Sequence, residues 1–419
     1  MADAEAARAR LDEWSAGFAA WFLDAGAERL APEPAVPRTD RTILFTNSAV
    51  VPFKPYIRGD LPLDRWVTVR QPCIRSQNLR ATFEADFHTE FVLHFEMLGA
   101  MAPAADLDPF TDRVAGYFGR RLDLGPSDVA FKVHSAHQDL DRAWRRAWDG
   151  PVGYDSEPDG FYEWTFGDAG MTGRGATFCL VQPDGRWRDL GNLIAFEWQG
   201  RTVAYGFGIG VETLAAGLTA GRWVIDSMPE GRISRPETPE QAKLADLVGM
   251  LVQLYRAGIA PSSRGQGSIL RKALVYTERL SGLLGVPDEE LIGGIARLGA
   301  VEAPGMDVAA LFRADLDRLR HQSTSTRSVD LSFLCDASLS AEKLCGIAEE
   351  ASLPQSLHMD ADVLDTWRGA SLPEGQHSIT LTLSLTSPSP LDPATLRGVL
   401  REIADHLSAR CSAVLRGSI

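Results

Sequence analysis

The sequence is poor in three features, and each would have pointed to a class of protein. It has no run of about 18 apolar residues, the length that a membrane-spanning helix needs, so we expect no membrane contact. Its five cysteines form no CxxC pair, so the expected setting is reduced and cytoplasmic. Positive charge is scarce, with 42 Lys and Arg against 56 Asp and Glu and a net charge of −14. This balance argues against a broad nucleic-acid surface but permits a local basic patch.

Several catalytic signatures are missing as well. The sequence contains no GxSxG nucleophile turn and no Walker A lysine. Its eight histidines show no spacing typical of metal ligands, so we expect no metal site built from histidines. These absences exclude the common hydrolase, P-loop and zinc-site patterns.

Hydrophobic spacing predicts an α+β protein. It indicates an amphipathic helix over residues 4–25 and two strands, 64–75 and 91–99, that form a long-looped hairpin. Many strands with few alternating helices favour an antiparallel sheet flanked by helices. Helical spacing dominates 238–322, which predicts a helical domain. Residues 327–419 show the order strand, helix, strand, strand, helix, strand, which is typical of a ferredoxin-like α/β sandwich.

Two short features suggest a nucleotide site. Residues 208–218, GIGVETLAAGL, begin as a glycine turn and continue as a helix, although a lone GxG is typical of any tight turn. Arg75 stands at the end of a predicted strand, where its planar donors can bind phosphate oxygens. It can also stabilise charge that develops while an acid is activated. Phe95 offers an aromatic face for adenine. The alternative is a surface arginine and a core phenylalanine.

Six segments occur in the order and approximate spacing of the alanyl-tRNA synthetase catalytic core, which the chain resembles. They are ILFTNSAVVPFKPY, RQPCIRSQ, HFEMLG, WTFGDAGMTG, GNLIAFEW and GIGVETL. A seventh, AGIAPSSRGQGSILRKA, is similar to the start of that family's helical tRNA-recognition region. The resemblance covers about residues 10–285. It implies a class II aminoacyl-tRNA synthetase domain over 1–236 and a helical tRNA-recognition-like domain over 237–322.

The C-terminal part resembles a different family. SVDLSFLCD, VLDTWRGASLPEGQHSITLTLSL and the final helix are similar to the ferredoxin-like anticodon-binding domain of phenylalanyl-tRNA synthetases. This resemblance implies a third domain over 327–419. The sequence shows no editing domain of the alanyl family.

The alanyl-tRNA synthetase resemblance implies two groups of site residues. Arg75 takes the place of the arginine that binds the ATP α-phosphate, so it is the predicted catalytic residue. The residues that match or replace the family's ATP site are Arg75, Gln77, Phe95, Met97, Gly208, Gly210 and Glu212. Those that match or replace its amino-acid pocket are Trp164, Asn192, Ile194, Glu197 and Gly206. ATP and Mg²⁺ are the implied cofactors.

Three positions depart from the family's pattern. Thr213 replaces the arginine that holds the γ-phosphate in class II enzymes, a contact worth on the order of 2–4 kcal/mol. Gly206 replaces an aspartate that binds the substrate α-ammonium, and Glu197 could supply the missing negative charge. The loop 76–90 lacks the family's GGKHND, so ATP handling is expected to differ.

Evidence for tRNA binding is divided. Residues 251–280 carry a net charge of +4, and Arg264, Arg271 and Lys272 are the predicted tRNA-binding residues. Residues 327–419 carry a net charge of −5, which is unusual for an anticodon-binding domain.

These observations leave three functional hypotheses. The favoured one is an enzyme that forms an adenylate of alanine or a similar small amino acid and transfers it to tRNA. The second is a ligase with a small-molecule acceptor, as in specialised metabolism such as antibiotic biosynthesis. The third is a catalytically weak paralog that binds tRNA, the adenylate or a regulatory partner. The sequence is compatible with a homodimer or a monomer.

Overall fold

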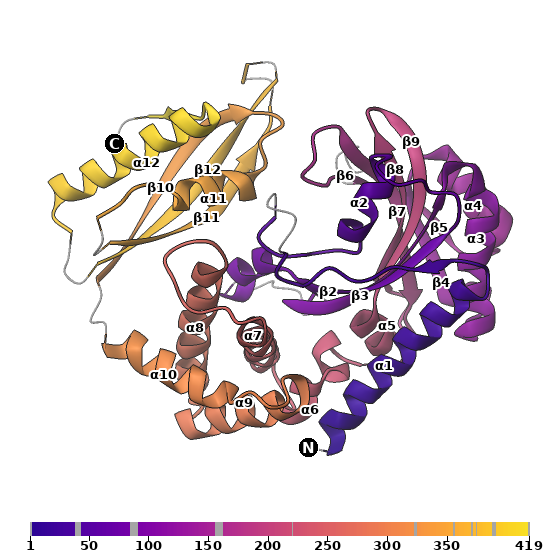
Figure 1. The fold of residues 1–419 in the computed structure, drawn as a ribbon, viewed down its shortest axis with the longest axis horizontal. Helices are drawn as coiled ribbons and strands as arrows, with labels where there is room; N and C mark the ends of the chain where they lie inside the picture. The colour runs from indigo at the N-terminus through magenta and orange to yellow at the C-terminus, as the bar shows by residue number, and fades with distance from the viewer. Residues whose placement is uncertain are drawn as a thin grey trace. The chain divides into compact units, whose positions relative to one another are not determined.

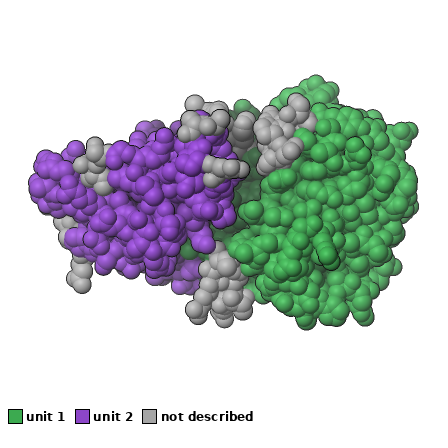
Figure 2. All heavy atoms as spheres, turned by 90° about the horizontal axis from the view of Figure 1, so that it is seen from above, with its two compact units in different colours: residues 1–78, 86–253, 293–306 green, residues 79–85, 254–292, 307–419 purple. Residues whose placement is uncertain are grey.

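The chain, seen here in a computed structural model, separates into two compact units (Figure 2). Unit 1 comprises residues 1–78, 86–253 and 293–306, and unit 2 comprises 79–85, 254–292 and 307–419. Each unit has its own sheet and its own hydrophobic core. The structure describes residues 2–37, 43–83, 91–155, 162–219, 221–321, 325–354, 357–369, 372–373, 375–387 and 391–417.

Unit 1 is built on one large sheet (Figure 1). Among the described residues the strand order is β1-β2-β3-β9-β8-β7-β4-β5, with β6 paired to β7. Only the β1–β2 and β4–β5 pairs in this order are parallel. The antiparallel-dominated sheet confirms the predicted α+β class. The strands are β1 (Glu28–Arg29), β2 (Val67–Ile74), β3 (His94–Pro103), β4 (Val129–His134), β5 (Val152–Asp155), β6 (Glu163–Thr165), β7 (Met171–Val181), β8 (Trp187–Trp198) and β9 (Arg201–Gly210).

Helices pack on both faces of this sheet. The helices with residues in unit 1 are α1 (Ala2–Leu23), α2 (Val50–Ile57), α3 (Leu107–Gly116), α4 (Gln138–Ala147), α5 (Val211–Leu218), α6 (Pro229–Ser234), α7 (Pro239–Arg256) and α9 (Asp288–Glu302). The main core joins α1, α3, α4 and α5 to one sheet face. A second cluster joins α2 to the other face. The amphipathic helix predicted for 4–25 is thus confirmed as α1, which buries Leu11, Phe18 and Phe22.

The predicted long-looped hairpin is confirmed by the antiparallel pairing of β2 and β3. After β2 the chain forms a short 3₁₀ segment, Ser76–Phe83. Residues 84–90, the remainder of the predicted loop, lie outside the described part of the chain.

Unit 2 combines helices with a second sheet. Helices α8 (Gly265–Leu284) and α10 (Val308–His321), together with α7 and α9, confirm the predicted helical stretch. The described C-terminal residues form an antiparallel sheet of order β11-β12-β10-β13. Its elements are β10 (Ser325–Asp336), α11 (Ala341–Glu349), β11 (His358–Trp367), β12 (Gln376–Ser387), α12 (Pro393–Cys411) and β13 (Val414–Arg416). The predicted ferredoxin-like order is therefore confirmed.

The start of α12 shows how the local sequence sets an element. The Asp392 carboxylate accepts the backbone N–H groups of Ala394 and Thr395, and Pro393 occupies the first helical turn. The division into domains 1–236, 237–322 and 327–419, and the relation of the last to an anticodon-binding domain, stay predictions. None of the helices in the described residues is long and apolar enough to cross a membrane.

Phe207 of β9 lies at the centre of the unit 1 core, with 1 % of its surface exposed. Its ring centroid is 5.4 Å from that of Phe178, 5.7 Å from Phe118 and 5.8 Å from Phe18. We expect Phe207→Ala to lower the free energy of unfolding by about 3–5 kcal/mol through the cavity it leaves. Urea unfolding followed by tryptophan fluorescence measures this loss. Leu61→Ala, at a side chain 45 % exposed, should change it by less than about 0.5 kcal/mol. Equal losses in both variants would contradict the assignment of the core.

Candidate active site

One face of the unit 1 sheet gathers most of the residues predicted for the ATP and amino-acid sites. Met97 lies opposite Gly210, Asn192 opposite Gly208, and Ile194 opposite Gly206. Directly paired residues point to the same side of a sheet, and every second residue along a strand does so as well. We call this surface the glycine face and define it as Phe95, Met97, Asn192, Ile194, Gly206, Gly208 and Gly210.

The three glycines of β9 differ in the space above them. A Cβ atom added at Gly208 would lie 3.5 Å from Sδ of Met97, an ordinary contact. One added at Gly210 would lie 3.2 Å from Oγ1 of Thr213. At Gly206 the added atom would lie 2.4 Å from Cε2 of Phe196. An aspartate at position 206 therefore requires the Phe196 ring to move.

Arg75 follows directly after β2. Its backbone N–H donates to the carbonyl of Leu93 at 2.7 Å. Its guanidinium carbon lies 4.4 Å from the centroid of the Phe95 ring, a cation–π arrangement. Burial lowers the pKa of Arg75, but an arginine keeps its charge at any ordinary pH. A cation and an aromatic ring thus lie together at one end of the glycine face. Gln77 is exposed in the 3₁₀ segment that follows.

Trp164 and Asn192 lie on two strands, β6 and β8, that both pair with β7. Trp164 of β6 pairs with Gly173, and its ring covers Gly175, where an added Cβ would be 2.8 Å from Cζ3. Asn192 donates through Nδ2 to Oγ1 of Thr177 at 3.1 Å. The amide of Asn192 is therefore fixed in orientation by β7.

Glu197 does not join the glycine face. It follows a register shift in the β8–β9 ladder after Phe196, and its carboxylate binds Arg174 at 3.1 Å and Thr172 at 3.2 Å. Arg174 in turn pairs with Asp139 at 2.8 Å. Since Arg174 lies opposite Ala195, this network is on the other side of the sheet. The hypothesis that Glu197 holds a substrate amine beside Asn192 is not supported by this position.

Glu212 also points away from the glycine face. Both of its carboxyl oxygens accept the backbone N–H of Glu96 at 3.0 Å, and only 2 % of its surface is exposed. Burial and the nearby Glu96 raise the pKa of Glu212. This contact makes Glu212 a support for the start of β3.

Two buried acids behind β3 were not predicted from the sequence. Asp246 of α7 accepts the backbone N–H of Leu93 at 2.9 and 3.1 Å. Glu230 of α6 contacts Nε2 of His94 at 2.5 Å. The sequence does carry a signal for Asp246, which stands within the apolar helical stretch AKLADLVGMLV. Since buried acids are rare without a partner, an acid in such a stretch indicates a specific contact.

The predicted tRNA-binding residues of unit 2 are only partly available. Nζ of Lys272 lies 3.0 Å from Oδ1 of Asp362 on β11, and Lys272 is 8 % exposed. Burial lowers the pKa of Arg271, against the attraction of nearby Asp360. Arg264 is exposed, and its Nη2 donates to the carbonyl of Ala351 at 3.3 Å. Lys272 is thus paired with a half-buried carboxylate, and its role in tRNA binding stays a prediction.

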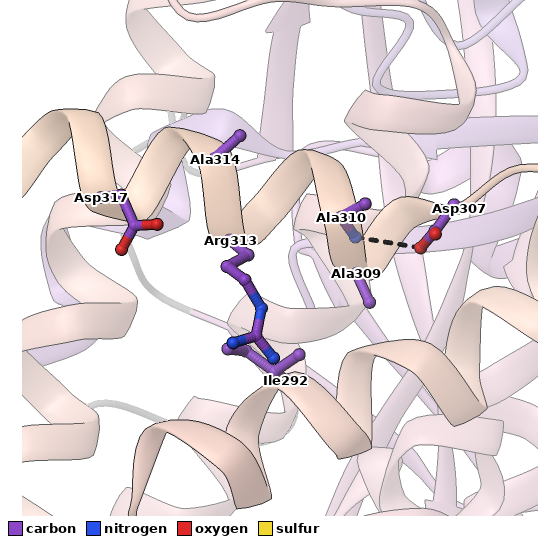
Figure 3. Close-up of a pocket in the computed structure, with 7 residues that line it drawn as sticks. All are labelled: Ile292, Asp307, Ala309, Ala310, Arg313, Ala314 and Asp317. Carbon is purple, nitrogen blue, oxygen red and sulfur yellow. Dashed lines mark hydrogen bonds between the residues drawn. The ribbon is translucent and has the colours of Figure 1, made fainter.

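A surface hollow of about 420 Å³ lies along α10 in unit 2 (Figure 3). Its polar groups have structural partners: Asp307 caps the helix at the N–H of Ala310, and Arg313 pairs with Glu289. None of the predicted site residues lines this hollow. The lining residues are Ile292, Asp307, Ala309, Ala310, Arg313, Ala314 and Asp317.

The described residues contain no group of three His, Cys, Asp or Glu side chains arranged to hold a metal ion. Glu212, the acidic residue predicted for the ATP site, is occupied by the backbone of β3. The described part of the chain therefore shows no Mg²⁺ cage built from its own side chains. This is compatible with Mg²⁺ that is held mainly by nucleotide phosphates and water.

The burial of Asp246 predicts a pH dependence. Burial raises its pKa from 3.8 to about 7, while the Leu93 amide and His94 lower it and Glu230 raises it. Because this pKa is higher in the folded than in the unfolded state, its contribution to stability is complete below about pH 4 and declines as pH rises through 7. We expect Asp246→Asn to flatten the decline in the free energy of unfolding between pH 4 and 7, measured by urea titrations. Glu240→Gln, on the exposed start of α7, should retain the wild-type slope. An unchanged slope in Asp246→Asn would contradict the assignment.

Comparison with known proteins shows which families the chain is similar to. Residues 14–152 match the family model described as tRNA synthetases class II (A). The chain is 25% identical over 352 residues to an alanine–tRNA ligase of Parafrankia sp. (strain EAN1pec), covering 70% of this chain and 38% of the relative. It is 24% identical over 386 residues to that of Bradyrhizobium diazoefficiens, covering 80% of this chain and 42% of the relative.

Among solved structures, asparaginyl-tRNA synthetase from Pyrococcus horikoshii aligns with a TM-score of 0.34 at 15% identity. The alignment covers 56% of this chain and 68% of that chain, and a likeness this weak supports no conclusion. The chain spans about two fifths of the length of the two alanine–tRNA ligases. Residues 14–152 thus match the class II (A) tRNA synthetase model, and the chain is similar in sequence to alanine–tRNA ligases over 70–80% of its length.

Proposed function

We propose that the protein uses ATP to activate alanine or a similar small amino acid as an aminoacyl-adenylate on the glycine face. One observation carries the proposal: seven residues predicted for this chemistry, from β3, β8 and β9, share one sheet face. Arg75 lies over Phe95 at the end of that face. A substrate carboxylate oxygen attacks the α-phosphorus of ATP. The bond from the α-phosphorus to the bridging oxygen then breaks, and pyrophosphate leaves.

The residues divide the work of this step. Arg75 presents several N–H donors to the α-phosphate and stabilises the charge that develops there. Gly208 and Gly210 keep the sheet surface low, so a nucleotide can approach the backbone closely. Phe95 offers an apolar ring to the base. Since the Arg75 guanidinium now covers this ring, nucleotide binding requires Arg75 to turn toward the phosphate.

The same face favours a small substrate. The Phe196 ring fills the space above Gly206, and the Trp164 ring covers Gly175. Ile194 lies beside Phe166, near Gly173. None of the seven glycine-face residues carries a negative charge. Our candidate for holding the substrate amine on this face is the Asn192 amide, which Thr177 fixes in orientation.

An exchange assay tests the activation step. Incorporation of labelled pyrophosphate into ATP, screened over twenty amino acids, should be stimulated by alanine or another small one. Arg75→Ala should lower this exchange by about 100-fold or more, because it removes a charge-assisted contact to the reacting phosphate. Arg65→Ala serves as the matched control, since Arg65 is exposed and pairs only weakly with its neighbour Asp64. If no amino acid stimulates exchange, activation is refuted and the weak regulatory paralog remains.

We propose tRNA as the acceptor, because the relatives are named alanine–tRNA ligases. Arg264 supplies an exposed positive charge in the segment similar to their tRNA-recognition region. A second candidate is a small-molecule acceptor. The observation that favours it is the ion pair between buried Lys272 and half-buried Asp362, which removes a free cation from the supposed tRNA surface.

The two acceptors give different products and different variant effects. Transfer to tRNA should yield an alkali-labile label on the RNA. Arg264→Ala should then weaken tRNA binding and reduce its salt slope by about one, as expected for one lost phosphate contact. Lys272→Met should leave the tRNA affinity and its salt slope within about twofold of wild type, because the Lys272 ammonium group is already paired with Asp362. Active exchange without any labelled tRNA would decide for the small-molecule acceptor.

A further inference from the structure

The first residues of β3 are held from behind by three helices that follow one another in the chain. This segment runs from Leu93, the residue before β3, to Glu96, and it contains Phe95 of the glycine face. Asp246 of α7 binds the N–H of Leu93, and Glu212 of α5 binds the N–H of Glu96. Glu230 of α6 contacts the side chain of His94. Each of these acids is buried, with at most 5 % of its surface exposed.

The Asp246 contact leads directly to Arg75. The Asp246 carboxyl group accepts the Leu93 N–H at 2.9 and 3.1 Å, and the Leu93 carbonyl accepts the Arg75 N–H at 2.7 Å. Asp246, Leu93 and Arg75 thus form one continuous path of two successive hydrogen-bonded contacts. A displacement of Leu93 would therefore move the backbone on which the Arg75 guanidinium is carried.

The Glu212 contact replaces a missing strand partner. Pairing between β3 and β9 ends at Met97 opposite Gly210, where β9 gives way to α5. Glu96 precedes Met97 in β3, and its N–H would lack a partner in the ladder with β9. The Glu212 carboxyl group accepts this N–H instead. The ladder is thereby extended by a side chain next to Phe95.

The His94 contact also depends on a glycine of α7. A Cβ atom added at Gly249 would lie 2.3 Å from Oε1 of Glu230 and 2.4 Å from Nε2 of His94. Gly249 therefore leaves the space in which this pair meets. Although burial alone would lower it, the nearby Glu230 raises the pKa of His94 to about 9. A charged His94 beside Glu230 ties α6 to the start of β3.

Simple stability does not explain three buried acids at one short segment. A buried acid costs more free energy than a neutral acceptor, and a neutral acceptor can satisfy a backbone N–H equally well. What the acids provide is a fixed position for Leu93 and Glu96, on either side of Phe95.

We infer that Asp246 is a positioning residue that acts through Leu93 to hold the backbone of Arg75 and Phe95 in the position needed to bind ATP. This inference rests on the proposed function, because it assigns Asp246 a role in the same nucleotide site. Asp246 does not touch the nucleotide; its effect passes through the two hydrogen-bonded contacts described above. Glu212 supports the other end of the same four residues.

Calorimetric titration of the full chain with ATP tests this role without any amino acid present. Asp246→Ala should raise the ATP dissociation constant by about ten- to a hundredfold, the loss typical of a misplaced binding group. Asp246→Asn keeps an oxygen that accepts the Leu93 N–H, so it should stay within about threefold of wild type. Glu240→Ala, an exposed acid on the same helix, is the matched control. If Asp246→Ala does not fold, Asp246→Ser takes its place, since its shorter side chain does not reach Leu93.

A kinetic readout separates positioning from general destabilisation. In the exchange assay Asp246→Ala should raise the KM for ATP while the KM for the amino acid changes by less than about twofold. Wild-type ATP affinity in a folded Asp246→Ala, or equal losses in Asp246→Asn and Asp246→Ala, would overturn the inference. If ATP binds with the expected pattern but no amino acid stimulates exchange, the proposed function fails and the positioning role stands. If the wild type binds no ATP, both fail.

Discussion

The antiparallel register between β3 and β9 is the constraint on which the candidate site depends. It places Met97 opposite Gly210 and Gly99 opposite Gly208. Because side chains alternate along a strand, a slip of one residue would turn the buried Phe207 and Ile209 outward and the glycines inward. Both hydrophobic clusters oppose that slip, since residues on the two sides of the same strands are packed by different helices. The core therefore fixes the site.

Much of this could be predicted from the sequence because it is local. Leu11 and Phe18 of α1 show helical spacing. In the β9 segment RTVAYGFGIG, large apolar residues alternate with alanine and glycine from Ala204 onward. The motifs HFEMLG, GNLIAFEW and GIGVETL predict that Phe95, Asn192 and Gly208 belong to one site. Strand alternation is a property of the backbone, so these side chains had to share a face once the strands paired.

The remainder depends on partners distant in the chain, which periodicity does not reveal. Asp246 meets Leu93 across 153 residues, and Lys272 meets Asp362 across 90. From the sequence alone, Lys272 in the tRNA-recognition-like segment would be expected to be free to bind phosphate, because the sequence does not show its ion pair with Asp362. Glu197 lies on the other side of the sheet from Asn192 for a different reason: neighbouring residues of a strand face opposite ways, and the register shift after Phe196 gives no signal in the sequence.

The Phe196 ring above Gly206 has an evolutionary consequence. Because the ring occupies the volume that a side chain at 206 would need, the two positions do not vary independently. A carboxylate at 206 fits only after a smaller residue replaces Phe196. Either substitution alone lowers stability, because the first creates a clash and the second leaves a cavity. A pair of positions coupled in this way restricts the order of mutations.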